Sequence, residues 1–286
     1  MRNFFKGFFE KKVILKALAA VLFFFAVDEG FYWLRMAIGF NFGTSNFGAL
    51  AKEVYGKVIP ALITAFIFGT KDVLERTSWK SLGKGLVSGG LFLTIAGFGI
   101  YCGIEHMNEE GLSFKQPLEI TFYILFVLCI GLSEELFMRG TVTELMLRRY
   151  GDTRKGTWIS VIIGSLLFGG MHITNIFAGQ GIMATLAQVV VTAFMGFTFN
   201  AVYVRHRNIY SVMILHALLD LFTIWEYGMI SGNSIANVHS SSDPGRLSIN
   251  LLQIALYGIS GLIIMRRRKV KNNKKNVPAD ITESIA

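Results

Sequence analysis

Apolar residues in this chain gather in long runs separated by polar segments, and eight of these runs are long enough to suggest membrane crossings. A bilayer core is about 30 Å thick and an α-helix rises about 1.5 Å per residue, so each crossing needs about 20 mostly apolar residues. The second run is the shortest, and it contains Lys57 and Pro60. The pattern predicts helices near residues 13–35, 55–70, 82–104, 118–140, 157–176, 182–204, 209–230 and 247–265.

Composition also indicates a membrane protein. Of the 286 residues, 52% are hydrophobic and 16% charged, whereas an average soluble domain is about 25% charged. We therefore expect an all-α polytopic membrane protein, a bundle of about eight transmembrane helices forming one domain over residues 13–265. Residues 1–12 form a basic N-terminus, and the first apolar run lacks a small-residue cleavage site, which favours an uncleaved first span. Residues 266–286 form a basic tail that we expect to be disordered.

Lys and Arg residues indicate the orientation. With both termini on one side, 21 of the 28 Lys and Arg residues fall on that side and five on the other. The positive-inside rule then predicts a multi-pass protein of the cell membrane with both termini in the cytoplasm. The net charge of +9 is explained by this topology and by contact of residues 266–275 with anionic lipid, so no nucleic acid partner is needed. Cys102 and Cys129 fall within predicted spans, so they indicate neither a disulfide framework nor a cysteine zinc site.

Ionisable residues inside the apolar runs are the candidates for chemistry, because a charge in lipid costs roughly 2.5–3.5 kcal/mol on insertion scales. The fourth run ends in Leu-Ser-Glu134-Glu135-Leu-Phe-Met-Arg139. Residues four apart share a helix face, so Glu135 can pair with Arg139, while Glu134 is turned about 100° away and is free to face a cavity. The alternative is that both glutamates end the span at the interface. The following segment, 141–150, is amphipathic and is expected to lie along the inner membrane surface with a structural role.

Two further motifs place histidines in apolar runs. Phe168 precedes His172 by one helical turn, with Gly169 and Gly170 between them, and His216 precedes Asp220 at the same spacing. A single membrane histidine is more often part of an interhelical hydrogen bond than a catalyst, but two histidines and a free glutamate together favour a site. Helix rise puts Glu134 and His216 at similar depth, whereas His172 comes out roughly 10 Å too far from the inner face. Either the fifth helix projects into the cytoplasm, or it tilts and breaks near the glycines.

These motifs, Glu-Glu-x-x-x-Arg, Phe-x-x-x-His and His-x-x-x-Asn/Asp in this order on successive spans, resemble those of the CAAX-prenyl-endopeptidase and bacteriocin-processing family (CPBP, or Abi). The resemblance covers roughly residues 118–230. It implies an intramembrane endopeptidase acting on a membrane-associated peptide or protein, with a water-filled cavity open to the cytoplasm.

By the same resemblance, Glu134 activates water, His172 assists, and His216 and Asp220 stabilise the oxyanion, with Glu135, Arg139 and Phe168 in support. Eukaryotic-type members have Asn where this chain has Asp220. Because a carboxylate donates no hydrogen bond unless protonated, Asp220 could instead orient His216.

Metal-free catalysis is favoured over zinc catalysis. Glu134, His172 and His216 would make a zinc ligand set that leaves one position for water. The His-Glu-x-x-His spacing of common zinc proteases is absent, as is a Gly-x-Ser-x-Gly serine elbow.

Two functions of other classes fit the intramembrane charges. One is a proton-coupled transporter, although the two halves of the chain show no repeat. The other is a non-catalytic bacteriocin-immunity or scaffold protein that binds a partner through the same cavity.

Overall fold

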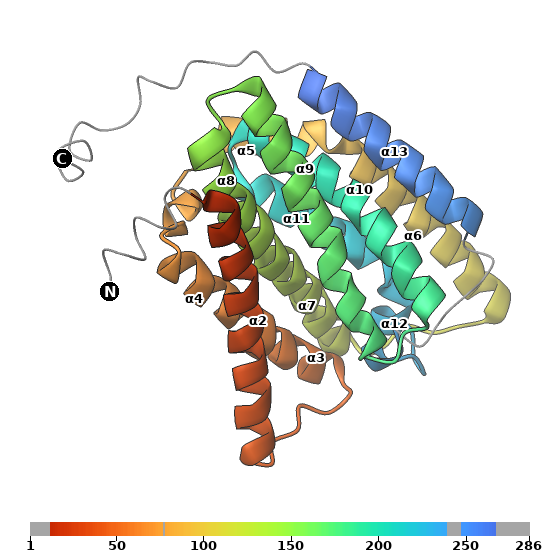
Figure 1. Ribbon diagram of the computed structural model, residues 1–286. Coiled ribbons are helices and arrows are strands. Elements are labelled where there is room, and N and C mark those ends of the chain that lie inside the picture. Colours follow the sequence, from red (N-terminus) through yellow and green to blue (C-terminus); the bar gives the residue numbers. More distant parts are fainter. Residues whose placement is uncertain (1–11, 77, 239–246, 267–286) are drawn as a thin grey trace.

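The structure is a computed structural model that describes residues 12–76, 78–238 and 247–266, and no β-strand occurs among these residues. The expected N-terminal segment up to residue 11 and the tail from residue 267 lie outside the described residues. The helices are packed side by side as a bundle (Figure 1). The α-helices are α2 Val13–Ala37, α3 Asn46–Glu53, α4 Ile59–Ile67, α5 Trp79–Ser88, α6 Gly90–Glu110, α7 Pro117–Glu135, α8 Glu144–Tyr150, α9 Arg154–Met171, α10 Ile182–His206, α11 Ile209–Thr223, α12 Trp225–Met229 and α13 Leu247–Arg266.

Short segments of other helix types join several of these elements. Two are π-helical, η1 Val54–Val58 and η3 Leu136–Thr143, and three are 3-10 helices, η2 Lys71–Leu74, η4 His172–Ile176 and η5 Ile235–Asn237. The π segment η3 connects α7 to α8 without a break, so residues 117–150 form one long helical element.

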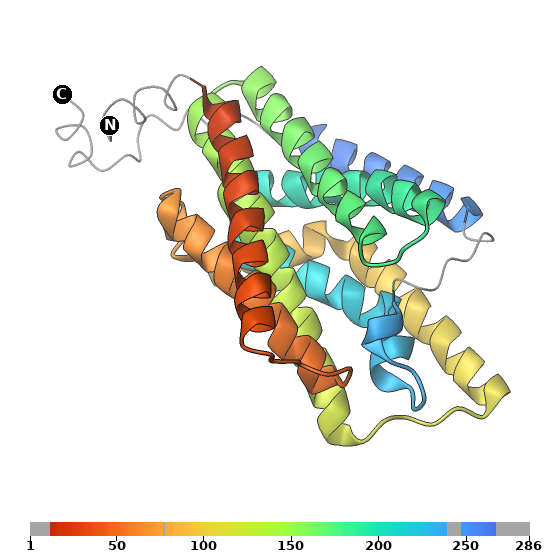
Figure 2. The same ribbon diagram turned by 60° about the horizontal axis from the view of Figure 1, so that its bottom comes forward.

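The predicted fold class, an all-α polytopic membrane protein, is confirmed. Among the described residues, five helical segments are long and apolar enough to cross a membrane: Gly90–Glu110, Pro117–Tyr150, Arg154–Ile176, Ile182–His206 and Ile249–Arg266. Helices also occupy the other three predicted runs, as α2, as α3 to α4, and as the shorter apolar α11. The predicted run 209–230 is divided, since α11 ends at Thr223 and α12 follows after a bend. α2 packs against α4, η3 and α8 on one side of the bundle (Figure 2).

Loops that should share one membrane face do meet at one end of the bundle. Asn46 donates to the carbonyl oxygens of Glu119 and Gly228, at 2.8 and 2.7 Å. Lys115 donates to the carbonyl oxygen of Tyr227 at 2.9 Å. These contacts join the start of α3, the start of α7 with the residue Lys115 before it, and α12, which the sequence places together towards the outer face.

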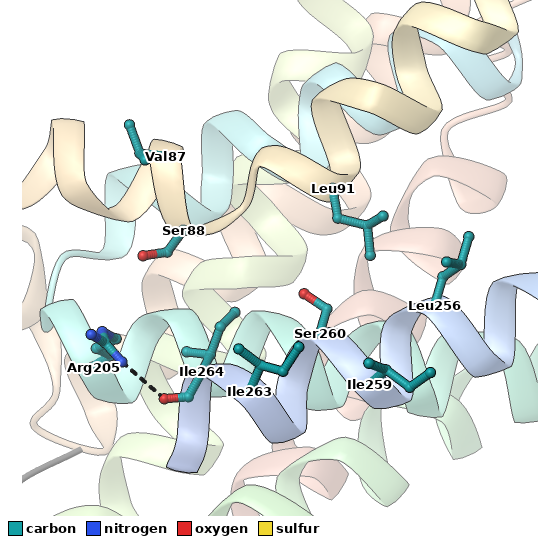
Figure 3. A pocket seen from close by; sticks show the side chains of 9 residues that line it. All are labelled: Val87, Ser88, Leu91, Arg205, Leu256, Ile259, Ser260, Ile263 and Ile264. Carbon is teal, nitrogen blue, oxygen red and sulfur yellow. Dashed lines mark hydrogen bonds between the residues drawn. The ribbon is translucent and has the colours of Figure 1, made fainter. Parts of the chain in front are cut away.

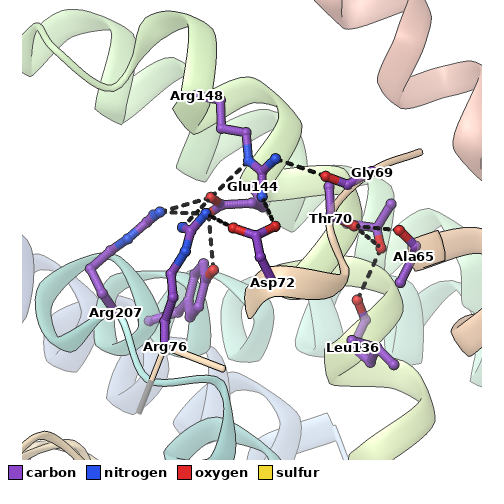
Figure 4. Close-up of polar contacts among 11 residues, drawn as sticks. Ala65, Gly69, Thr70, Asp72, Arg76, Leu136, Glu144, Arg148 and Arg207 are labelled. Atoms are coloured by element: carbon purple, nitrogen blue, oxygen red, sulfur yellow. Dashed lines mark hydrogen bonds and ion pairs between the residues drawn. The ribbon is translucent and has the colours of Figure 1, made fainter. Parts of the chain in front are cut away.

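The opposite end of the bundle is held by a buried glutamate and three arginines, called here the Glu144 cluster (Figure 4). Glu144 is fully buried and pairs with Arg76 at 2.7 Å, with Arg148 at 3.1 Å and with Arg207 at 2.7 Å. Asp72 pairs with Arg76 and with Arg148, the latter at 2.5 Å. The cluster ties together the three connections that precede α5, α9 and α11, all of which the sequence places on the basic side.

The Glu144 cluster also corrects the expectation for residues 141–150. Residues 141–147 are buried at 8% exposure or less, so this segment packs within the bundle instead of lying along a surface. The amphipathic interpretation placed Glu144 on a solvated face. Neutralisation by arginines from distant segments, together with a hydrogen bond from Tyr203 at 2.9 Å, stabilises this carboxylate in the interior.

Protonation of Asp72 at low pH should weaken the ion pairs of the Glu144 cluster. Desolvation raises the pKa of this carboxyl, but hydrogen bonds and charges of Arg148 and Arg76 outweigh it and hold the pKa below its usual 3.8. A depressed pKa contributes stability above the unfolded-state value that is lost as pH falls through the folded-state value. Asp72→Asn should therefore lower the unfolding temperature at pH 6, and the difference between native and variant proteins should shrink below pH 3.8 and vanish only below the lower folded-state pKa. The pairs are partly exposed, so we expect a difference of about 0.2–1 kcal/mol; equal stabilities at pH 6 would contradict the argument.

Close contact between α7 and α11 positions the predicted site. A Cβ atom at Gly131 would lie 2.4 Å from the carbonyl oxygen of Met213 and 2.9 Å from the amide nitrogen of Ala217, so only glycine permits this approach. Residue 216 on α11 thereby comes against residues 134 and 135 on α7.

Candidate active site

The two adjacent glutamates at the end of α7 occupy different environments, as the helical spacing predicts. Arg139 Nη1 donates to Glu135 Oε1 at 2.8 Å, and both side chains are completely buried. The Glu134 side chain, by contrast, is 28% exposed. One carboxylate is thus neutralised by an internal cation, while the other remains accessible.

Aromatic rings and a backbone carbonyl complete the surroundings of Arg139. The guanidinium lies 4.1 Å from the centre of the Phe168 ring and 5.3 Å from that of Phe199. Its Nη2 donates to the carbonyl oxygen of Gly196 at 3.2 Å. A Cβ at Gly196 would lie 2.8 Å from Phe168, so this glycine lets α10 pass close to α9. Phe168 therefore has a clear structural contact, over the face of a buried cation.

His216 lies at the centre of the polar cluster. Its Nδ1 is 2.7 Å from Glu135 Oε1, and because an ionised carboxylate only accepts hydrogen bonds, Nδ1 is the donor. Nε2 consequently points towards the other two carboxylates, 3.9 Å from Glu134 Oε2 and 3.6 Å from Asp220 Oδ2. His216 is 3% exposed, and its ring stacks on that of Phe199, with the ring centres 5.3 Å apart. Its orientation is therefore fixed on both the polar and the apolar side.

Asp220 lies near His216, as its spacing on α11 suggests, but it does not hydrogen-bond the ring. The carboxylate is 3.6 Å from His216 Nε2, within ion-pair distance but longer than a hydrogen bond. The group that holds the imidazole is Glu135, on the opposite ring nitrogen. Asp220 is 21% exposed and so stands beside Glu134 as the second accessible carboxylate.

His172 lies where α9 ends. The α-helix stops at Met171 and continues as the 3-10 segment η4, so the break expected near Gly169 and Gly170 is present. His172 Nδ1 is 3.0 Å from the carbonyl oxygen of Phe168. The Phe168 ring links the two histidines, with its centre 5.2 Å from that of His172 and 6.0 Å from that of His216.

Sequence reasoning missed Glu53. Ser133, immediately before Glu134, donates to Glu53 Oε1 at 2.7 Å. Glu53 ends α3, which begins at Asn46, nine residues before the predicted start of the second span at residue 55. Ser45 caps this helix by accepting from the backbone N–H of Gly48, and a serine before an apolar stretch was the available signal. Glu53 therefore adds a carboxylate from the N-terminal half to the edge of the site.

Comparison with known proteins supports the family inferred from the motifs. Residues 116–222 match the family model described as Type II CAAX prenyl endopeptidase Rce1-like. This segment contains every predicted site residue, from Glu134 to Asp220. The match supports the CAAX protease family for this segment of the chain, and the family implies a hydrolase of the protease class. No curated protein matches the chain significantly.

Proposed function

We propose that this protein hydrolyses a peptide bond in a membrane-associated peptide or protein, with Glu134 as the general base that activates water. One observation carries the proposal: the accessible carboxylate of Glu134 faces Nε2 of an imidazole whose other nitrogen is held by a buried ion pair. Amide hydrolysis needs an activated water, stabilisation of the tetrahedral oxyanion and a proton for the leaving amine. Glu134 can meet the first and third of these needs, and His216 can meet the second.

In the proposed reaction, Glu134 takes a proton from water as the water oxygen bonds to the carbonyl carbon. An Nε2–H of protonated His216 stabilises the resulting oxyanion, because the imidazolium donates from both nitrogens while Glu135 accepts from Nδ1. The tetrahedral intermediate then collapses with cleavage of the C–N bond. Glu134 returns its proton to the leaving amine, so the carboxylate is regenerated.

His172 and Asp220 have secondary roles in this proposal. His172 assists Glu134 in proton transfer, and its own orientation is set by the Phe168 carbonyl. Asp220 acts as an accessible carboxylate that favours the imidazolium form of His216 by charge. Glu135 orients the His216 ring. Asp220 is therefore not needed for that role, and this chain has Asp at position 220 where eukaryotic-type members have Asn.

We derive no step through zinc. Among the described residues, no group of three or more His, Cys, Asp or Glu side chains is placed to hold a metal ion. Nδ1 of His216 is also already engaged by Glu135. The metal-free mechanism is tested directly by chelation.

The expected result is that EDTA or 1,10-phenanthroline leaves cleavage by the purified protein unchanged. Elemental analysis of the same preparation should give far less than one zinc per chain, because the described residues do not supply the three protein ligands of a catalytic zinc site. Loss of cleavage with the chelator and its return with added zinc would overturn the metal-free proposal while leaving hydrolysis in place.

The substrate is found by comparing membrane peptides from cells that carry the native protein with those from cells that carry Glu134→Gln. Products of the protease should be present only with the native protein, and their uncleaved precursors should accumulate with the variant. Identical peptide profiles would count against endopeptidase activity in those cells.

A further inference from the structure

A groove lies between α5 and α6 on one wall and α13 on the other (Figure 3). Its volume is about 430 Å³. Val87 and Leu91 line the first wall, and Leu256, Ile259 and Ile263 line the second. Val87 is 81% exposed and Ile259 57%, so the groove opens towards the region that lipid occupies around a membrane protein.

The charged group of this groove lies at one end, whereas the hydroxyl of Ser260 lies among the apolar residues of α13. The charged group is Arg205, at the end of α10, and its Nη1 donates to the carbonyl oxygen of Ile264 at 3.1 Å (Figure 3). Ser88 is close by and is 2.7 Å from His206 Nε2. Leu256 lies towards the other end. The groove therefore has an apolar length and a cationic head.

The cationic head has no counter-charge from the protein. Among the described residues, no carboxylate lies within ion-pair distance of Arg205, and neither Asp nor Glu lines the groove. A guanidinium has five N–H donors, and within the part of the chain that the structure describes Arg205 uses one of them, to Ile264. Lys84, one turn before Ser88, and Arg266, one turn after Ile263, are both exposed and add positive charge at the same end.

We propose that this groove binds an anionic phospholipid, with one acyl chain between α6 and α13 and the phosphate at Arg205. The apolar walls match an acyl chain in chemistry, and the unpaired guanidinium matches a phosphate in charge and hydrogen-bonding geometry. Basic pockets between transmembrane helices are typical sites for anionic headgroups. The cationic head lies at the end of the bundle where Arg207 joins the Glu144 cluster, which the charge distribution assigns to the basic membrane face.

The test is native mass spectrometry of the full-length protein in detergent, with added phosphatidylglycerol or phosphatidylcholine. The native protein should retain phosphatidylglycerol preferentially. Arg205→Gln should lower the affinity for phosphatidylglycerol about fivefold, the effect of one basic residue near an anionic lipid, and should leave phosphatidylcholine unaffected. Ser260→Trp, which fills the groove from α13, should weaken binding of both lipids.

Arg149→Gln is the matched control, because Arg149 is an exposed cation that does not line the groove. It should bind both lipids as the native protein does, and circular dichroism should show all three variants folded. Equal binding of the two lipids by the native protein would overturn the proposal. So would an affinity for phosphatidylglycerol that survives both groove variants, or a groove that takes a farnesylated peptide and no phospholipid.

Discussion

Glu134→Gln should reduce peptide cleavage by about 10²- to 10⁴-fold, the usual contribution of a general base. Glutamine has nearly the same shape as glutamate and can fill the same space, but its amide accepts no proton from water near neutral pH. Glu134 is 28% exposed and is not part of the buried ion pair, so the fold should be retained. Cleavage is measured with purified protein in liposomes and a membrane-anchored peptide, with the products identified by mass spectrometry.

Glu105→Gln provides the control for this substitution. Glu105 is an exposed glutamate of α6, outside the matched family segment, and its replacement removes the same charge. Its cleavage rate should equal that of the native protein. Undiminished turnover by Glu134→Gln in the same liposomes would refute the role of Glu134 as base.

Much of the fold could be predicted because the bilayer imposes a length on each apolar run. Helices occupy all eight predicted segments, and residues four apart, such as Glu135 and Arg139, meet as helix geometry requires. The boundaries were less predictable. The second run contains Lys57, a charge that is unfavourable within a span, and the structure pairs it with Asp28 of α2 inside a continuous helical region. Such pairing depends on which helices become neighbours, and the local pattern of apolar and polar residues does not predict this.

The same limit explains what was missed in the site. Local spacing offers Asp220 as the partner of His216, because the two residues share a helix face. The structure instead gives Nδ1 to Glu135, which is 81 residues away in sequence. Glu144 was read as a surface residue for a related reason, since its partners Arg76 and Arg207 come from distant connections. Short-range motifs therefore identified the chemical groups, while their pairing required tertiary packing.

Arg139→Met should destabilise the protein by about 3–5 kcal/mol, because it leaves Glu135 as a buried carboxylate without its cation. Methionine fills much of the volume between Phe168 and Phe199, so the loss reflects charge more than a cavity. Unfolding is followed by circular dichroism during denaturant titration in detergent. Arg149→Met is the control and should unfold like the native protein, since Arg149 is exposed on the same helical element.

The double variant Glu135→Gln with Arg139→Met separates charge from packing. Glu135 Oε2 and Arg139 Nε are buried without a hydrogen-bond partner among the described residues, so the ion pair does not recover its full cost of desolvation. Removing both charges should therefore restore much of the stability lost in Arg139→Met. Cleavage should stay low in the refolded double variant, because a neutral amide at residue 135 holds Nδ1 of His216 less strongly than a carboxylate does. A double variant as unstable as Arg139→Met would show that packing of the guanidinium, and not compensation of the Glu135 charge, is what Arg139 contributes.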